Sequence, residues 1–230
     1  MDVSKFEKNI GVSFNNRELL QQAFVHRSYI NENKAFKLSH NERLEFLGDA
    51  VLELIVTEYL YKKYPSKPEG DLTSYRAALV NAVTLSKVAA DLEMNQYLLM
   101  SKGESKDMGR ARQVILANTF ESFVGALYLD RGYEDAKKFI VRELLDKIEE
   151  EIVQNNLWRD AKSLLQERAQ ESLNITPSYK MISEIGPDHN KLFTLGLYFN
   201  EQLVTEGKGH SKQEAEQAAA KKALEIYSWS

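Results

Sequence analysis

Four carboxylates recur at helical spacing between residues 42 and 53. If this stretch is a helix, at about 100° per residue, one side carries Glu42, Glu45, Asp49 and Glu53, and the other carries Leu44, Leu47, Val51, Leu54 and Ile55. No Lys or Arg stands four residues from any of the acids. Like charges at this spacing destabilise a helix by about 0.2–0.5 kcal/mol per pair. A solvated polar face is the ordinary interpretation of such a stripe, but a bound divalent cation would remove the repulsion.

A second group of polar residues interrupts an otherwise apolar stretch. Residues 113–129 are apolar nearly all round, which predicts a buried helix, yet one of its faces carries Asn118, Glu121, Ser122 and Gly125. Glutamate is almost never fully buried without a partner. Gly48 in the first helix costs about 1 kcal/mol relative to Ala, and a close packing contact would explain it.

These residues suit the hydrolysis of a phosphodiester. The reaction at neutral pH needs an activated water and stabilised charge on the attacking and leaving oxygens, and two-metal sites supply both. Magnesium prefers carboxylate and water oxygens. The chain has no cysteine and only four scattered histidines, so oxygen ligands are expected. Glu45 and Asp49 lie one turn apart, and we expect Glu121 and Asn118 to complete the site from the buried helix.

The surrounding pattern predicts two domains. Residues 1–152 read as helices, with the acid-bearing helix running to about residue 64 before Pro65, Pro68 and Gly70, and we expect an all-α catalytic domain. A polar linker follows at 153–158. Residues 159–228 predict a small α+β domain in the order α-β-β-β-α, with strands at 179–184, 192–199 and 202–206. Ser211 and Glu214 form a capping box that opens the last helix.

The stretch at 42–52 reads ERLEFLGDAVL and resembles the signature of the bacterial ribonuclease III family. Two further elements resemble that family, namely the HRSY element at 26–29 and an EGxLTxxRxxLVN-like element beginning at Glu69. The resemblance implies a metal-dependent endoribonuclease acting on double-stranded RNA, with Mg²⁺ as cofactor and Mn²⁺ as a possible substitute. It implies catalytic roles for Glu45, Asp49 and Glu121, and metal ligation by Glu45, Asp49, Asn118 and Glu121. Asn118 departs from the family, which commonly has Asp there.

The roles expected for three other residues are less specific. Glu42 and Glu69 match two further acids of the family's cleft and are assigned to RNA or subunit positioning. His26 is expected to make a structural hydrogen bond near a helix end.

The C-terminal segment resembles a double-stranded RNA-binding domain, because residues 207–216 read GKGHSKQEAE, close to the motif GxGxSKKxAE. Gln213 stands where a second lysine is usual, which should weaken phosphate binding modestly. Such domains read A-form RNA by shape across two minor grooves and the major groove between them. The expected RNA contacts are Ser163, Gln166, Glu167 and Gln170 on the first helix, His189 in the loop at 187–189, and Lys208 and Lys212 for phosphates.

The position of Phe46 on the helix predicts that the protein forms a homodimer. It lies about 40° from Glu42 on the acid side of the helix, so we expect it to be exposed in a single chain. Members of the family act as homodimers, which makes a second subunit the expected cover for this aromatic. Packing of Phe46 against another helix of its own chain is the alternative.

Composition limits the remaining choices. The chain has 230 residues, 43% hydrophobic, and a net charge of −4, so a phosphate-binding surface must be local rather than global. No apolar run reaches 18 residues and no signal-peptide pattern opens the chain, so we expect a cytoplasmic protein with no membrane partner and no small-molecule cofactor. Two rival functions stay open: a non-cleaving or weakly cleaving double-stranded RNA-binding dimer, and an acid-rich helical interaction protein.

Overall fold

The structure is a computed structural model that describes residues 2–106, 109–149, 161–187 and 191–229. Its contacts divide the chain into two compact units, Met1–Trp158 and Arg159–Ser230, and each has its own hydrophobic core. The predicted linker at 153–158, with the domain boundaries beside it, lies outside the described residues, and so does His189.

The first unit is built from helices, as the sequence pattern predicts. They are α1 (Ser4–Ile10), α2 (Arg17–Ala23), α3 (Arg27–Glu32), α4 (Glu42–Lys63), α5 (Glu69–Leu79), α6 (Ala82–Asp91), α7 (Arg110–Arg131) and α8 (Tyr133–Ile140). A π-helical segment, Val141–Glu149, continues α8, and short 3-10 turns lie at Met94–Gln96 and Glu104–Lys106. Within the described residues, no helix is long and apolar enough to cross a membrane.

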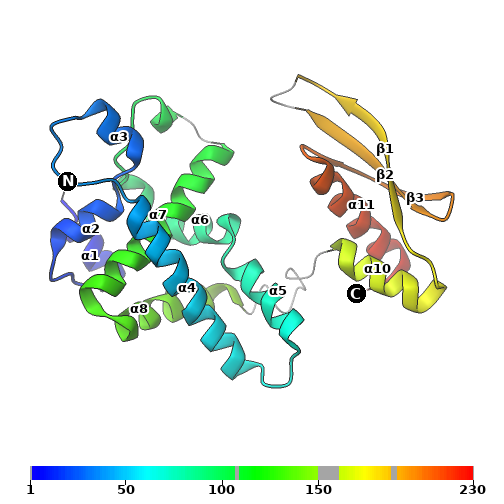
Figure 1. The fold of residues 1–230 in the computed structure, drawn as a ribbon, viewed down its shortest axis with the longest axis horizontal. Helices are drawn as coiled ribbons and strands as arrows, with labels where there is room; N and C mark the ends of the chain where they lie inside the picture. The colour runs from blue at the N-terminus through cyan, green and yellow to red at the C-terminus, as the bar shows by residue number, and fades with distance from the viewer. Residues whose placement is uncertain (1, 107–108, 150–160, 188–190, 230) are drawn as a thin grey trace. The chain divides into compact units, whose positions relative to one another are not determined.

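The two longest helices, α4 and α7, cross in the middle of this unit (Figure 1). At the crossing, a Cβ added to Gly48 would lie 1.8 Å from the carbonyl oxygen of Glu121, and one added to Gly125 would lie 2.2 Å from the carbonyl oxygen of Leu44. Only glycine allows so close an approach. The close packing expected from Gly48 is therefore confirmed, and its partner is the small-residue face of α7.

The buried face of α4 is shifted around the helix from the face that the sequence pattern predicts, because Leu52, Val56 and Leu60 are also buried. Leu44, Val51 and Ile55 are buried, but Leu54, which the pattern places with them, is 57% exposed. Leu54 lies about 80° around the helix from Leu44, at the rim of the apolar face. Because α7 covers a stripe centred on Gly48, this rim stays in solvent.

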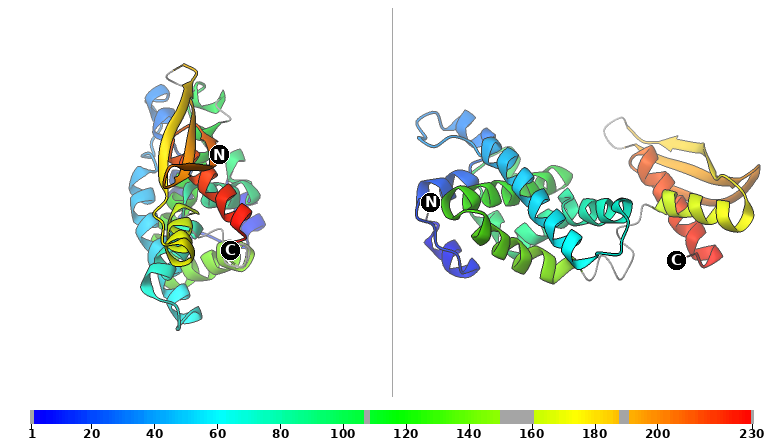
Figure 2. Two further views of the ribbon diagram at one scale, coloured as in Figure 1. Left: turned by 90° about the vertical axis from the view of Figure 1, so that its right-hand side faces the viewer. Right: turned by 60° about the horizontal axis from the view of Figure 1, so that its bottom comes forward.

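The second unit has one helix, three strands and a final helix, which confirms the predicted order. The elements are α10 (Ala161–Leu173), β1 (Ser178–Ile185), β2 (Leu192–Phe199), β3 (Gln202–Gly209) and α11 (Lys212–Tyr227). The strands form an antiparallel sheet in the order β1-β2-β3. Both helices pack on one face of the sheet (Figure 2), where Leu165 of α10 and Ala219 of α11 join Leu197 and Phe199 of β2 in the core.

The predicted capping box at the start of α11 is confirmed in one half. The hydroxyl of Ser211 accepts a hydrogen bond from the backbone N–H of Glu214 at 3.1 Å. The carboxylate of Glu214 accepts from the backbone N–H of His210 at 2.8 Å. Glu214 therefore ties the end of β3 to the first turn of α11.

The helix crossing yields a stability prediction. Gly→Ala inside an ordinary helix stabilises a protein by up to about 1 kcal/mol, but at Gly48 the added Cβ would collide with backbone. Overpacking a protein core usually costs roughly 1–3 kcal/mol. We expect Gly48→Ala to destabilise the nuclease unit by more than this amount. Thermal denaturation followed by circular dichroism measures this effect.

Gly70 in the first turn of α5 provides the matched control, because a Cβ there meets nothing within 4 Å. Gly70→Ala should leave the melting temperature unchanged or raise it slightly. A Gly48→Ala variant that melts at or above the wild-type temperature would contradict the close crossing.

Candidate active site

The start of α4 is fixed by a buried asparagine. Asn41, only 3% exposed, donates from its amide to the carbonyl oxygen of Ala23 at 3.1 Å, and its backbone N–H donates to Val25. From α7, the hydroxyl of Ser122 donates to the carbonyl oxygens of Asn118 at 2.7 Å and of Asn41 at 3.4 Å. These bonds set the first turn of α4 against the polar face of α7.

The crossing brings together acids that are far apart in the sequence. Burial, followed in decreasing order by the negative charges of Asp49, Glu45 and Glu53, raises the pKa of Glu121 to about 8. Burial also raises the pKa of Glu45, with Glu42 and Asp49 adding to the shift, while a side-chain hydrogen bond from Asn118 opposes it. We call Glu45, Asp49, Glu53 and Glu121 the acid cluster.

The acid cluster has the ligand chemistry of a site for a hard cation. In the described part of the chain, no ion pair involves Glu45, Asp49 or Glu121, so no Lys or Arg relieves their repulsion there. The available donors are carboxylate oxygens and the amide oxygen of Asn118, which suit magnesium. As the described side chains stand, however, no three His, Asp or Glu groups converge tightly enough to hold an ion.

Glu53 joins the cluster without having been assigned to the predicted site. Its charge contributes to the raised pKa of Glu121, although the sequence places it only in the stripe of acids along α4. The signal in the sequence that could have found it is its spacing, one turn after Asp49. Glu53 therefore lies at the edge of the site rather than on a separate polar face.

The two auxiliary acids lie in different surroundings. Glu42 borders the cluster, because its charge raises the pKa of Glu45, and its carboxylate lies 3.5 Å from the guanidinium of Arg27 and 3.7 Å from Nδ1 of His40. Glu69 lies in the first turn of α5, where it accepts a hydrogen bond from the hydroxyl of Thr73 at 2.9 Å. It borders a cavity of about 460 Å³ between α4 and α5 and does not contribute to the shifts of Glu45 and Glu121.

His26 has a structural position, as expected. It precedes α3, and its Nδ1 accepts from the backbone N–H of Ser28 at 3.3 Å, capping the helix. The same nitrogen lies 2.8 Å from the Ser28 hydroxyl, which in turn accepts from the backbone N–H of Ser101 at 3.0 Å. His26 therefore helps to hold the segment that precedes α7.

The second unit presents the predicted RNA contacts on its surface. On α10, Ser163, Gln166, Glu167 and Gln170 are exposed, and the amide of Gln170 donates to Asn174 at 2.6 Å. Lys208 and Lys212 are exposed on either side of the β3–α11 junction. Gly207 and Gly209 let β3 lie against the first turns of α11, because a Cβ on Gly207 would lie 2.0 Å from the carbonyl oxygen of Ala215.

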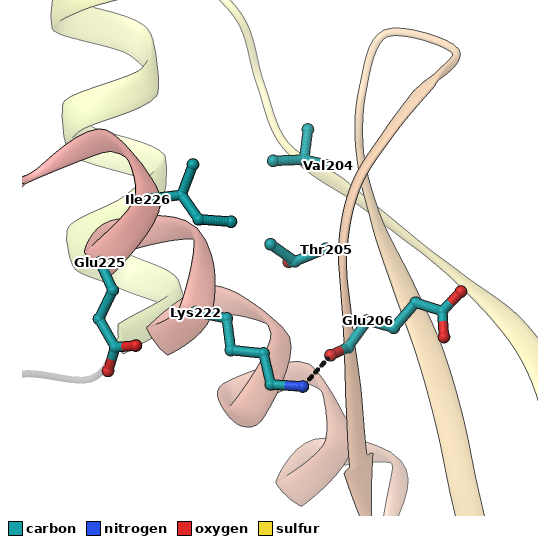
Figure 3. Close-up of a pocket in the computed structure, with 6 residues that line it drawn as sticks. All are labelled: Val204, Thr205, Glu206, Lys222, Glu225 and Ile226. Carbon is teal, nitrogen blue, oxygen red and sulfur yellow. Dashed lines mark hydrogen bonds between the residues drawn. The ribbon is translucent and has the colours of Figure 1, made fainter.

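A separate pocket of about 540 Å³ lies between β3 and the later turns of α11. Lys222 donates to the carbonyl oxygen of Glu206 at 2.8 Å at this pocket, beside Val204, Thr205 and Ile226 (Figure 3). The bond covers one acceptor of the unpaired edge of β3, a common protection of edge strands. None of the predicted RNA contacts lines this pocket.

Comparison with known proteins identifies both units. Residues 16–148 match the family model described as ribonuclease-III-like, and residues 161–227 match the double-stranded RNA binding motif. Ribonuclease 3 of Borreliella burgdorferi is 46% identical over 222 residues, covering 96% of this chain and 90% of the relative. Ribonuclease 3 of Streptococcus pneumoniae strain P1031 is 44% identical over 219 residues, covering 95% and 94%.

A solved structure supports the same assignment for the first unit. The nuclease domain of ribonuclease III from Campylobacter jejuni is 39% identical, with a TM-score of 0.57, and the match covers 64% of this chain and 99% of that one. This structure supports the helical fold of the first unit, and the two family models match the two units separately. The chain therefore belongs to the ribonuclease III family, with a nuclease domain followed by a double-stranded RNA-binding domain.

Proposed function

We propose that this endoribonuclease hydrolyses phosphodiester bonds of double-stranded RNA at a magnesium site held by Glu45, Asp49, Asn118 and Glu121. The observation that supports this site best is the raised pKa of Glu121, about 8, at the point where acids from α4 and α7 meet. When bound, magnesium supplies an activated water and stabilises the charge that develops on the attacking and leaving oxygens. Manganese has the same preference for oxygen ligands and is the expected substitute.

The chain's own residues prepare the site for a cation. With a pKa of about 8, Glu121 is mostly protonated at neutral pH when no cation is near, and cation binding requires it to release that proton. A side-chain hydrogen bond from Asn118 opposes the raised pKa of Glu45, so the amide favours the charged form of this carboxylate. Glu45, Asp49 and Glu121 are the proposed catalytic residues, because their carboxylates would hold the metal that activates water for the reaction.

Substrate binding is assigned mainly to the second unit. The exposed side chains of α10, Ser163, Gln166, Glu167 and Gln170, face solvent and can meet 2′-hydroxyls in a minor groove. Lys208, Lys212 and the N-terminus of α11 can hold phosphates, with His189 proposed for a second minor groove. Glu42 and Glu69 are proposed to position RNA or the second subunit. Processing of cellular duplex RNA is expected to take place in the cytoplasm, without a small-molecule cofactor.

Cleavage and binding can be separated by one substitution. Glu121→Gln removes a carboxylate from the acid cluster with almost no change in volume, so we expect cleavage of a plain RNA duplex to be abolished and duplex binding to stay nearly unchanged. Glu45→Gln should behave in the same way. Magnesium-dependent cleavage and electrophoretic mobility measure the two properties.

The matched control is Glu134→Gln, which neutralises an exposed acid of the nuclease unit outside the acid cluster. It should cleave at the wild-type rate. If Glu121→Gln also cuts at the wild-type rate, the assigned site is wrong.

Asn118 decides between the main proposal and its alternative. An amide oxygen can ligate a hard cation but brings one negative charge fewer than the Asp common in the family, so a non-cleaving or weakly cleaving RNA-binding dimer is the second candidate. We expect Asn118→Asp to lower the magnesium concentration needed for half-maximal cleavage, because the added charge attracts the ion. A magnesium titration of the cleavage rate measures this.

Asn33→Asp, at the end of α3, adds the same charge outside the acid cluster and should leave the magnesium requirement unchanged. An unchanged or raised requirement in Asn118→Asp would show that the amide is not a ligand. A wild type that binds duplex RNA but does not cut it at any magnesium concentration would favour the alternative function.

We also propose that the enzyme is a homodimer with Phe46 at the subunit contact. Phe46 is 82% exposed, as expected, which removes the alternative that it packs within its own chain. It borders a cavity of about 700 Å³ lined in part by Leu19, Leu47 and Leu129. The Campylobacter jejuni nuclease domain is described as structurally flexible in a region involved in dimer formation. An exposed aromatic beside an apolar hollow fits a symmetric contact in which each Phe46 enters the other subunit's hollow.

Truncating an interface hot spot typically costs about 2 kcal/mol or more. Phe46→Ala should therefore raise the dimer dissociation constant by about 30-fold or more, with unchanged helix content. Sedimentation across a dilution series measures it, with Val83→Ala, an apolar residue 64% exposed on α6, as control. The contact is refuted by a variant that stays as dimeric as the wild type, or by a wild type that is monomeric throughout.

A further inference from the structure

The cavity between α4 and α5 begins one turn beyond the acid cluster. Its wall on α4 includes Thr57 and Tyr61, which follow Glu53 by one and two turns of the same helix. Residues four apart on a helix are surface neighbours, with Cβ atoms about 5–6 Å apart. All three side chains are exposed, so an open row of α4 connects the acid cluster to the cavity.

Helix α5 and the connection before it form the opposite wall. α5 packs along the C-terminal part of α4 (Figure 1), and this wall consists of Lys67, Glu69, Leu72, Thr73 and Arg76. Among the apolar lining residues, Leu60 of α4 is buried and Leu72 is half-buried, so polar groups surround an apolar interior. The volume of about 460 Å³ lies within the roughly 300–1,000 Å³ of typical ligand sites and can hold one nucleotide unit.

Arg76 gives this cavity a positive charge. In the described part of the chain no ion pair involves Arg76, whereas Lys67 pairs with Asp71 at 3.7 Å. The guanidinium of Arg76 instead donates to the hydroxyl of Thr57 at 3.0 Å. A guanidinium carries five donors in a planar fork that matches the oxygens of a phosphate. Thr57 therefore orients a cation whose chemistry suits a phosphate.

The position of this cation suits a strand that passes the acid cluster. Thr57 lies eight residues beyond Asp49 on α4, which is about 12 Å along the helix axis. The carboxylates repel the phosphates of RNA, and a guanidinium at this distance offsets the repulsion. Tyr61, which is 73% exposed, adds an aromatic ring to the same lining. Arginine and aromatic side chains occur together in RNA-binding sites.

We propose that the cavity between α4 and α5 is an RNA-contact site of the nuclease unit, in which Arg76 holds a phosphate near the cleaved bond and Tyr61 packs against the adjoining ribose. The inference rests on the proposed function, because the strand reaches the cavity by passing the acid cluster. It adds a contact within the nuclease unit to those assigned to the second unit. A contact made equally in the bound substrate and in the transition state lowers KM and leaves kcat unchanged.

Two substitutions of Arg76 in the full-length chain test the phosphate contact. Arg76→Gln removes the charge and keeps an amide that can still donate to Thr57. Because hydrogen bonds to charged groups are the stronger ones, we expect KM for a plain RNA duplex to rise about tenfold, with kcat unchanged. Arg76→Lys keeps the charge without the fork, and its KM should lie between those of Arg76→Gln and the wild type. Steady-state cleavage at one fixed magnesium concentration measures both constants.

Salt dependence provides the readout that a merely structural role would not move. Each phosphate contact releases counterions, so its loss flattens a plot of log affinity against log salt by about one unit. The slope of log(kcat/KM) against log[KCl] should therefore be flatter in Arg76→Gln and unchanged in Arg76→Lys. The control is Lys8→Gln, which removes an exposed positive charge from α1. It should keep the wild-type kcat/KM and the wild-type slope.

Tyr61 tests the second contact and decides the matter if the Arg76 variants fail to fold, because its side chain is exposed and its truncation leaves the core intact. Tyr61→Ala should raise KM severalfold at an unchanged melting temperature. Tyr61→Phe keeps the ring that packs on the ribose and should cleave with the wild-type KM. Loss in both variants would make the hydroxyl, rather than the ring, the contact and would contradict the assigned role.

Three results overturn the inference. These are a wild-type KM in Arg76→Gln, a raised KM in Arg76→Gln with the wild-type salt slope, and a Tyr61→Ala variant that cleaves as the wild type does. In each case the wild type still cleaves duplex RNA, so the proposed function stands. A wild type that does not cleave duplex RNA at any magnesium concentration would instead overturn the proposed function, and the inference with it.

Discussion

The close crossing of α4 and α7 is the contact on which the nuclease unit depends. Gly48 and Gly125 face each other there, and a Cβ on either would lie within 2.2 Å of a carbonyl oxygen of the other helix. No larger residue permits this approach. The crossing places Glu121 against Asp49 and Glu45, and any increase in the distance between the helices would separate the groups that raise its pKa. Packing and electrostatics are therefore coupled at one point.

The same coupling explains why the acid cluster disfavours the folded state of the chain. Glu121 is half-buried beside three other acids, and without a counter-charge it favours its protonated form. A cation at the proposed site would relieve this repulsion, so its binding energy would also stabilise the crossing. Asn118 moderates the arrangement, because it hydrogen-bonds Glu45 and adds no negative charge of its own. Compared with an Asp at this position, Asn118 leaves less repulsion among the acids when no cation is bound. It also attracts a cation less strongly.

The RNA-binding unit uses glycine in a similar way for a different purpose. Gly207 and Gly209 allow β3 to lie directly on the alanine-rich α11, where a Cβ on Gly209 would lie 2.6 Å from the backbone nitrogen of Ala215. This contact presents the N-terminus of α11 beside Lys208 and Lys212 at the surface. The ring of His210, which directly follows β3, lies 3.1 Å from the carbonyl oxygen of Lys191, the residue before β2. In both units, small residues set the distance between elements and polar residues act across it.

The sequence by itself determined the two-domain order, the helical stripe of acids and the exposure of Phe46, because these depend on local periodicity and on spacing along one element. It also indicated which residues of α7 form a polar face. Only the tertiary structure decided that the charge of Glu53 acts on Glu121, that Leu54 is exposed, and that the carboxylate of Glu214 accepts from the backbone of His210. Each of these depends on the angle and distance at which two elements meet, and periodicity along one element carries no information about that geometry.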